Sequence, residues 1–328
     1  MIRKLPRWIN SNRKATASLA LLAVVVAVNA LAFMHAHAMT HFAVDGERTG
    51  GPASLSTWQK AKVLLTGVRL PKPRISETPA EFGLSYHVHR FTSETGIEYE
   101  AWHVPCPESQ GLCVLFHGYG RCKSSLLGEA QAWRELGYET LLVDFRGAGG
   151  SSGRETSIGF HEADDVVAAC EFARRELTDE PPLLCGRSMG AVAVLRAVAK
   201  NDLEVKALIV ESPFDRLVST SENRFYAMGL PAFPFAQLLV FWGGVQHGYS
   251  GFEHNPVEYA EDVDCPVLLI NGTLDSRVTQ EQARSVFENL AGRKQLVFFE
   301  GVGHESCQAA DAQKWTRCVA EFLRQAGD

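Results

Sequence analysis

The pentapeptide at residues 186–190, Gly-Arg-Ser-Met-Gly, matches the pattern G-x-S-x-G and is the strongest chemical signal in the chain. An apolar run precedes it and a helical apolar pattern follows. A serine on a strand-to-helix turn needs small residues two positions away on each side, because the backbone there is strained. The helix that begins at the turn directs its free N–H groups toward the serine. The pattern predicts that Ser188 is a catalytic nucleophile.

An acid and a histidine follow two later apolar runs. Asp275 lies just past residues 267–270, and His304 lies just past residues 297–300. The carboxyl ends of strands in an open α/β sheet meet at one edge, so these side chains are expected near Ser188. In that arrangement His304 takes the serine proton and Asp275 orients the imidazole. Glu211 also follows an apolar run; we interpret it as structural or lid-facing, and it is the first alternative to Asp275.

A turn rich in small residues follows the apolar run 112–116. It reads His-Gly-Tyr-Gly at residues 117–120. Such a turn can aim the Tyr119 N–H at the point reached by the Met189 N–H, and the two would form an oxyanion hole. The alternative is an ordinary glycine turn at the end of a strand.

Strand-like and helical patterns alternate over more than 200 residues, which indicates a doubly wound α/β fold. The runs that predict strands are residues 84–91, 98–104, 112–116, 139–145, 182–185, 207–211, 267–271 and 295–300. Helices are expected at residues 124–136, 160–177, 189–200, 280–290 and 306–325. Residues 215–262 break the alternation and are rich in aromatic residues, so we interpret them as a lid. Aromatic residues that reach the pocket would favour an apolar substrate.

With these motifs the sequence resembles the α/β-hydrolase family from about Phe82 onward. Residues 144–153, Asp-Phe-Arg-Gly-Ala-Gly-Gly-Ser-Ser-Gly, are similar to the D-x-R-G-x-G-x-S turn of many members of the family. Residues 255–259, Asn-Pro-Val-Glu-Tyr, are similar to its serine aminopeptidase-like or monoacylglycerol-lipase-like branch. The resemblance implies a mostly parallel eight-stranded sheet flanked by helices, with a helical lid. It also implies a serine hydrolase that cleaves carboxylic esters, or else amides or thioesters, through an acyl-enzyme, with no cofactor and no metal.

Two departures narrow this resemblance. The chain has no H-G-G-G motif, which argues against hormone-sensitive-lipase-type chemistry, and a serine nucleophile argues against dehalogenases and epoxide hydrolases. The alternative functions are a non-catalytic binding module on the same fold, or an acyltransferase or peptidase that uses the same triad.

Composition and charge exclude other classes. With 46% hydrophobic residues, the 328-residue chain is too apolar for a disordered protein. Residues 1–34 carry five bases and no acid, which leaves 27 bases against all 38 acids in the rest of the chain. So acidic a body argues against nucleic acid as a partner.

The eight cysteines show no metal-binding spacing. Cys122 and Cys307 are the one candidate disulfide pair, with two free thiols as the alternative, because sequence does not determine connectivity.

The N-terminal segment predicts a membrane location. Residues 15–34 are uncharged and, as a helix, would span about 30 Å, the thickness of a bilayer core. The bases precede this run, which favours a cytoplasmic N-terminus and an extracytoplasmic catalytic domain. The alternative is a signal peptide cleaved after Ala38, giving a secreted protein.

We therefore divide the chain into an anchor or signal at 1–38, a connector at 39–80, and a hydrolase domain at 81–328 with its lid at about 215–262. The expected partners are the membrane and a small or lipid-like acyl substrate; no oligomeric state is predicted.

Overall fold

The computed structural model describes residues 7–50, 55–201 and 203–326. An eight-stranded sheet forms the centre, in the order β1-β2-β4-β3-β5-β6-β7-β8. β1 pairs with β2 and β2 with β4 in antiparallel fashion, and all other pairs are parallel. The strands are β1 His87–Thr92, β2 Glu98–Val104, β3 Leu112–Phe116, β4 Glu139–Val143, β5 Leu183–Arg187, β6 Ala207–Glu211, β7 Val267–Gly272 and β8 Lys294–Phe299. The predicted α/β-hydrolase architecture is confirmed.

Helices cover both faces of this sheet. Alternate residues of β3 show this: Val114 packs with α4 and α5, whereas Leu115 packs with α3 and α11. Every residue of β3 is buried, as expected for a strand covered on both sides. The helices on the first face are α4 Glu162–Glu176, α5 Met189–Lys200 and α9 Gln280–Asn289; those on the second are α3 Leu127–Glu135, α10 Cys307–Ala310 and α11 Ala312–Ala326.

The prediction of a single helix at residues 306–325 is wrong. The chain forms two helices that meet at Asp311, which has φ −151° and ψ 84°. The Asp311 carboxylate accepts a hydrogen bond from the Lys314 N–H at 2.9 Å, so it caps the start of α11. The side chain of an aspartate thus offers the backbone an alternative to a continuous helix.

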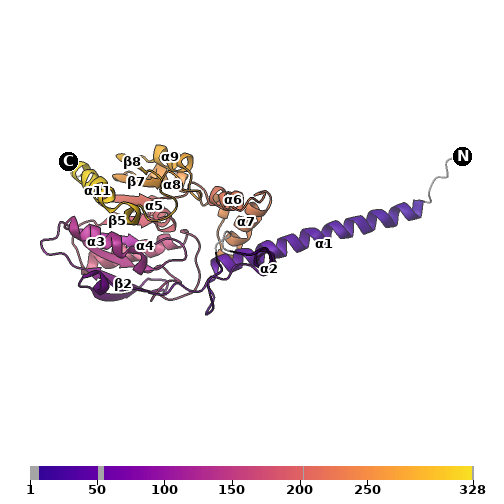
Figure 1. The fold of residues 1–328 in the computed structure, drawn as a ribbon, viewed down its shortest axis with the longest axis horizontal. Helices are drawn as coiled ribbons and strands as arrows, with labels where there is room; N and C mark the ends of the chain where they lie inside the picture. Colours follow the sequence, from indigo (N-terminus) through magenta and orange to yellow (C-terminus); the bar gives the residue numbers. More distant parts are fainter. Residues whose placement is uncertain (1–6, 51–54, 202, 327–328) are drawn as a thin grey trace.

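The predicted lid segment contains two main helices, α6 Leu217–Ala227 and α7 Phe235–His247. They stand off the domain on the side that faces the N-terminal helix (Figure 1). A small apolar cluster joins the lid to the domain, and it includes Leu217 of α6, Val240 of α7 and Val192 of α5. The last part of the segment differs, because α8 Pro256–Tyr259 packs on α5 as part of the domain.

The N-terminal helix α1 spans Arg7–Thr40, and its first part projects far from the domain (Figure 1). Its portion Lys14–Thr40 is long and apolar enough to cross a membrane, a property that signal sequences share. Residues 14–27 are exposed, whereas the last turns pack on α7. Trp242 of α7 donates a hydrogen bond from Nε1 to Asn29 Oδ1 at 3.2 Å, and its ring meets that of Phe33 edge-on at 5.4 Å. The short α2, Thr57–Thr66, follows in the connector.

A buried ion cluster holds the turns at the carboxyl end of β3 and β4. Lys123 is fully buried, and its ammonium group contacts both Asp144 and Glu100. Asp144 also accepts hydrogen bonds from the Lys123 N–H at 2.7 Å and the Gly150 N–H at 2.9 Å. Burial opposes ionisation of Glu100, but hydrogen bonds from Lys123 and Arg90 outweigh it and lower the pKa of that carboxyl. The cluster thus depends on one buried cation between two carboxylates.

We expect Lys123→Met to destabilise the protein by about 3–5 kcal/mol, because Asp144 would be left fully buried without a cation, while Glu100 would keep only its bond to Arg90. Thermal unfolding followed by circular dichroism measures the change. Lys200→Met is the matched control, since Lys200 forms an exposed ion pair with Asp262 at 2.8 Å. Such surface pairs contribute about 1 kcal/mol or less. Equal shifts in the two variants would contradict this account of the cluster.

Candidate active site

Ser188 lies on the turn between β5 and α5, in a backbone conformation with φ 53° and ψ −115°. The turn leaves no room for side chains at the neighbouring glycines. A Cβ on Gly186 would lie 2.5 Å from the Gly190 carbonyl oxygen, and one on Gly190 would lie 2.5 Å from that of Phe116. The Ser188 N–H donates to the Glu211 carbonyl oxygen of β6 at 2.7 Å. The two glycines therefore allow a strained turn that directs the serine out of the sheet edge.

The structure brings Ser188, His304 and Asp275 together in one hydrogen-bonded chain. The Ser188 Oγ lies 3.0 Å from His304 Nε2, and His304 Nδ1 lies 2.7 Å from Asp275 Oδ2. These side chains come from three different turns at the carboxyl ends of β5, β7 and β8. The arrangement fits proton transfer from the hydroxyl to the imidazole.

Asp275 is held as an ion by the backbone around it. Its Oδ1 accepts hydrogen bonds from the N–H groups of Arg277 at 2.8 Å and Val278 at 2.9 Å. Burial opposes its ionisation, but the hydrogen bond to His304 and these two amides outweigh burial and lower the pKa of Asp275. A carboxylate whose pKa is lowered in this way can stabilise a protonated His304.

The turn that carries Tyr119 lies directly against the serine turn. A Cβ on Gly118 would lie 3.6 Å from the Ser188 Cβ and 3.4 Å from the Arg187 carbonyl oxygen. Met189 is the first residue of α5, so its N–H has no carbonyl partner within the helix. Tyr119 and Met189 both line the pocket that contains Ser188 and His304. The geometry is compatible with the predicted pair of oxyanion donors.

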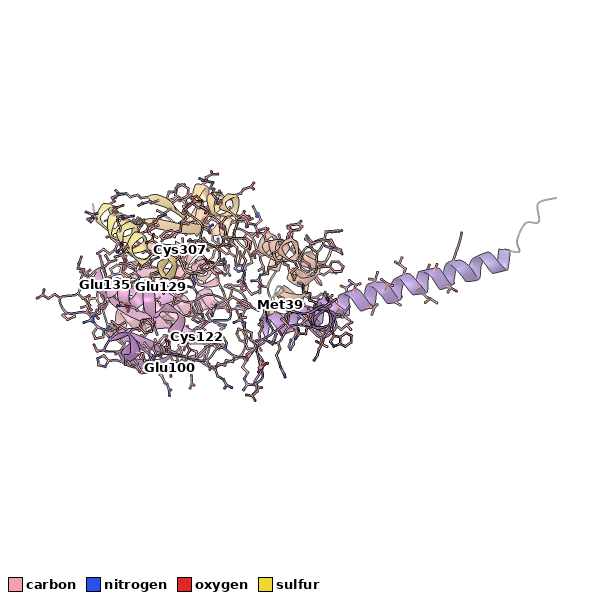
Figure 2. The ribbon with its side chains drawn as sticks, viewed as in Figure 1. Met39, Glu100, Cys122, Glu129, Glu135 and Cys307 are labelled. Carbon is pink, nitrogen blue, oxygen red and sulfur yellow. The ribbon has the colours of Figure 1, made fainter. Side chains whose placement is uncertain are left out.

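The sequence analysis missed one wall of this pocket, which comes from the end of α1. Met39 lines the pocket, and its carbonyl oxygen accepts a hydrogen bond from the Tyr119 hydroxyl at 2.5 Å. Figure 2 shows Met39 at the junction between the long helix and the domain. Nothing in the local sequence marks Met39, which the predicted division of the chain places in the connector. Only the folding of α1 back onto the domain brings it to the site.

Two arginines in the pocket wall, Arg224 of α6 and Arg277 of the loop after β7, were also missed. The rest of the wall is mainly apolar, with Phe214, Leu217 and Val278 among its residues. The cavity is about 40 Å³, far below the roughly 300–1,000 Å³ of most ligand sites. The lid of this structure therefore lies close over the serine.

Glu211, the alternative acid, lies elsewhere. Its carboxylate is buried and accepts a hydrogen bond from the Cys307 N–H at 3.0 Å. Burial raises the pKa of Glu211 to about 7, although Arg187 acts in the opposite direction. Within the part of the chain that the structure describes, Glu211 makes no hydrogen bond to His304. Its position supports a structural role, in which it ties β6 to the helix that follows the histidine loop.

The candidate disulfide between Cys122 and Cys307 is absent, and all eight cysteines are free thiols. The Cys122 Sγ instead lies 3.3 Å from the Arg74 carbonyl oxygen and 3.2 Å from Ser124 Oγ. Figure 2 shows Cys122 and Cys307 well separated. The alternative of two free thiols therefore holds, because the two turns, although both at the carboxyl edge of the sheet, direct these residues to different parts of it.

Comparisons with known proteins relate parts of this chain to hydrolases. Residues 107–240 match the family model described as serine aminopeptidase, S33. An uncharacterized protein of Bacillus subtilis, YqkD, is 26% identical over 239 residues, which cover 72% of this chain and 78% of that protein. Lysophosphatidylserine lipase ABHD12 of Danio rerio is 23% identical over 272 residues, which cover 73% of this chain and 68% of the lipase.

Solved structures show the same fold. The Pyrococcus furiosus esterase Pf2001 superposes with a TM-score of 0.65 at 22% identity, covering 77% of this chain and 97% of the esterase. Alpha/beta hydrolase domain-containing protein 10 from mouse superposes with a TM-score of 0.56 at 16% identity, covering 73% of this chain and 99% of that protein. Together with the sheet order, these similarities show that the chain has the α/β-hydrolase fold, and residues 107–240 are similar to the serine aminopeptidases of family S33.

Proposed function

We propose that this protein hydrolyses carboxylic esters through a Ser188–His304–Asp275 triad. The observation that carries the proposal is the unbroken hydrogen-bonded chain from Ser188 Oγ through His304 to Asp275, at 3.0 and 2.7 Å. This is the geometry that activates a serine hydroxyl, which is otherwise a weak nucleophile.

The mechanism assigns one task to each group. Ser188 Oγ attacks the acyl carbonyl carbon while His304 Nε2 takes the hydroxyl proton, and the N–H groups of Tyr119 and Met189 stabilise the oxyanion. The intermediate collapses as the protonated His304 donates to the departing alcohol oxygen, leaving the acyl group on Ser188. His304 then deprotonates a water molecule that attacks this ester, and the acid leaves with Ser188 restored.

Two other uses of the same site stay open to test. An amide or thioester would pass through the same steps with a different leaving atom, and an acyltransferase would accept an alcohol in place of water. A non-catalytic binding module is less well supported, because such a module needs no serine–histidine–carboxylate chain.

The position of the lid relative to α1 supports a lipid-like substrate and a membrane location. We propose that α1 anchors the protein, with its N-terminus in the cytoplasm and the catalytic domain on the other side. Asn29 and Phe33, which contact Trp242 of α7, belong to the uncharged run 15–34, so the lid would lie against the bilayer. The pocket wall is largely apolar, and displacement of the lid would admit an acyl chain from that side. The relative from Danio rerio is named lysophosphatidylserine lipase, and lysophosphatidylserine is a lipid that carries one acyl ester.

The end of α1 also bears on the alternative of cleavage after Ala38. Ala36 and Thr40 are 3% and 5% exposed, so both are buried against the rest of the protein. The Thr156 N–H donates to the Thr40 carbonyl oxygen at 2.9 Å, next to the bond between Tyr119 and Met39. Cleavage would cut through a packed turn of helix, and these contacts therefore favour a retained anchor.

We expect Ser188→Ala and His304→Ala each to reduce kcat by about 10³-fold or more, because triad residues act as a unit. Hydrolysis of p-nitrophenyl esters measures the rate, and a fluorophosphonate probe should label the wild type but not Ser188→Ala. The exposed Ser250→Ala is the matched control and should keep both activity and labelling. Near-wild-type turnover by His304→Ala would show that the site is misassigned.

We expect Asp275→Asn to keep the fold and to lose about 10³–10⁴-fold in kcat, because an amide at this position favours the wrong imidazole tautomer. Circular dichroism and ester hydrolysis at pH 8 test the two parts of this expectation. If Asp275→Asn keeps most of its activity and Glu211→Gln loses it, Glu211 is the acid of the triad and our assignment is wrong.

We expect a reporter enzyme that works only outside the cytoplasm to be active when it is fused after the last residue. The full chain should also stay with membranes after carbonate washing, because 20 uncharged residues span the bilayer core. The same fusion without residues 1–34 should be inactive, as the export signal is then gone. A soluble protein beginning at Met39 would contradict the anchor and establish cleavage.

A further inference from the structure

Two arginines, Arg224 and Arg277, line the pocket that contains the catalytic serine. Arg224 lies on α6, and the pocket residues of this helix, Leu217, Thr220, Ser221 and Arg224, follow the spacing of one helical face. Arg277 lies on the loop between β7 and α9, two residues after Asp275.

The backbone at Arg277 is fastened to α6. Its carbonyl oxygen accepts hydrogen bonds from Thr220 Oγ1 at 3.3 Å and from Asn223 Nδ2 at 3.0 Å. Both arginines therefore belong to one rim of the pocket, with their backbones held together.

Neither of these guanidinium groups forms an ion pair with any residue that the structure describes. Arg224 is half-buried and Arg277 is exposed. Two partly buried arginines elsewhere do form ion pairs: Arg146 pairs with Asp165 at 2.5 Å, and Arg187 lies 3.7 Å from Glu129. Arg224 lies instead over the Tyr119 ring, with its Cζ 5.5 Å from the ring centre. Burial lowers the pKa of Arg224; Tyr119 acts in the opposite direction, and the charge of Arg277 lowers that pKa further.

A third arginine lies close to the same turn. Arg48 donates from Nη1 to the Gly120 carbonyl oxygen at 3.1 Å, next to Tyr119. The acid of the site, Asp275, has its oxygens engaged by His304 and by the backbone amides of the next turn. A chain with net charge −6 thus gathers three arginines around Tyr119 at the pocket.

We propose that Arg224 and Arg277 form an anion subsite, and that the substrate is a single-chain ester carrying a carboxylate or phosphate group. This inference rests on the proposed esterase function. The apolar wall of Met39, Ile158, Phe214 and Val278 contacts the acyl chain, and the guanidinium groups bind the oxyanion group through charge-assisted hydrogen bonds. The two arginines are specificity residues, distinct from the triad.

Three octanoyl esters with one acyl chain and different alcohols test the subsite: those of glycerol, glyceric acid and glycerol 3-phosphate. With the full chain in non-ionic detergent, we expect kcat/KM to be at least tenfold higher for one of the two anionic esters than for the neutral one. Arg224→Gln and Arg277→Gln should each reduce that value by about 10–100-fold, mainly through KM, as expected for a lost hydrogen bond to a charged group. Their loss of kcat/KM on the glycerol ester, which has no anionic group, should be at least tenfold smaller than on the anionic ester.

Matched variants exclude general effects of charge and folding. Arg216→Gln removes an arginine from the start of the same helix, but this residue pairs with Glu258 at 3.0 Å outside the pocket, so selectivity should not change. Arg224→Lys should recover part of the preference, since it restores the charge without the guanidinium fork. An oleoyl ester of glycerol 3-phosphate in phosphatidylcholine vesicles, compared with the soluble octanoyl ester, distinguishes a lipid headgroup from a free anionic ester.

The possible failures are distinguishable. If the wild type hydrolyses the neutral ester as well as the anionic ones, or if the arginine variants lower all rates equally, the anion subsite is wrong and the esterase function stands. If none of these esters nor p-nitrophenyl octanoate is hydrolysed, the proposed function itself is wrong.

Discussion

The close approach of two turns at the carboxyl end of the central strands is the constraint on which the rest of the site depends. The turn after β5 leads into α5 and touches carbonyl oxygens at the end of β3. A Cβ at Gly190 would lie 2.5 Å from the Phe116 carbonyl oxygen. This contact sets Ser188 at φ 53°, beyond the sheet edge and beside the Tyr119 turn. Backbone packing therefore fixes the position of Ser188, and the other residues of the site are arranged around it.

Loops at that edge are held by polar groups that face inward. Lys123, Asp144 and Glu100 fasten the turns after β3 and β4, while Glu211 joins β6 to the helix after the histidine loop. Buried charges contribute little net stability when paired, but they penalise any arrangement that separates them. They therefore favour one conformation of these loops.

The last turns of the N-terminal helix pack on the catalytic domain, whereas residues 14–27 of the same helix are exposed. Its last turns pack on the lid helix α7, and Met39 supplies both a pocket wall and an acceptor for Tyr119. A movement of the lid relative to α1 would consequently alter the surroundings of the serine. This coupling gives a physical link between the proposed anchor and the proposed entry of substrate.

Local patterns determined a large part of this protein. The sequence predicted all eight strands to within three residues. The pattern was clearest for the central strands β3, β6 and β7, because strands covered on both faces must be continuously apolar. Ser188, Asp275 and His304 were predicted because each follows a predicted strand, and the topology of a parallel sheet brings them to one edge. The break at Asp311 was missed, since a capping aspartate resembles any polar residue on the outer face of a helix.

Contacts between distant segments were decided only in the tertiary structure. Met39 and Ser188 are far apart in sequence. Met39 reaches the pocket only because the end of α1 packs on the lid helix α7, and the periodicity of the sequence does not indicate this contact. The same holds for Arg224 and Arg277, which become neighbours only when α6 packs on the loop after β7. Likewise, the candidate pair Cys122 and Cys307 shares a sheet edge but not a contact. Sequence patterns indicate which side of each helix or strand is buried and which is exposed. Which two elements pack against each other depends on the three-dimensional fold, and a local pattern does not contain that information.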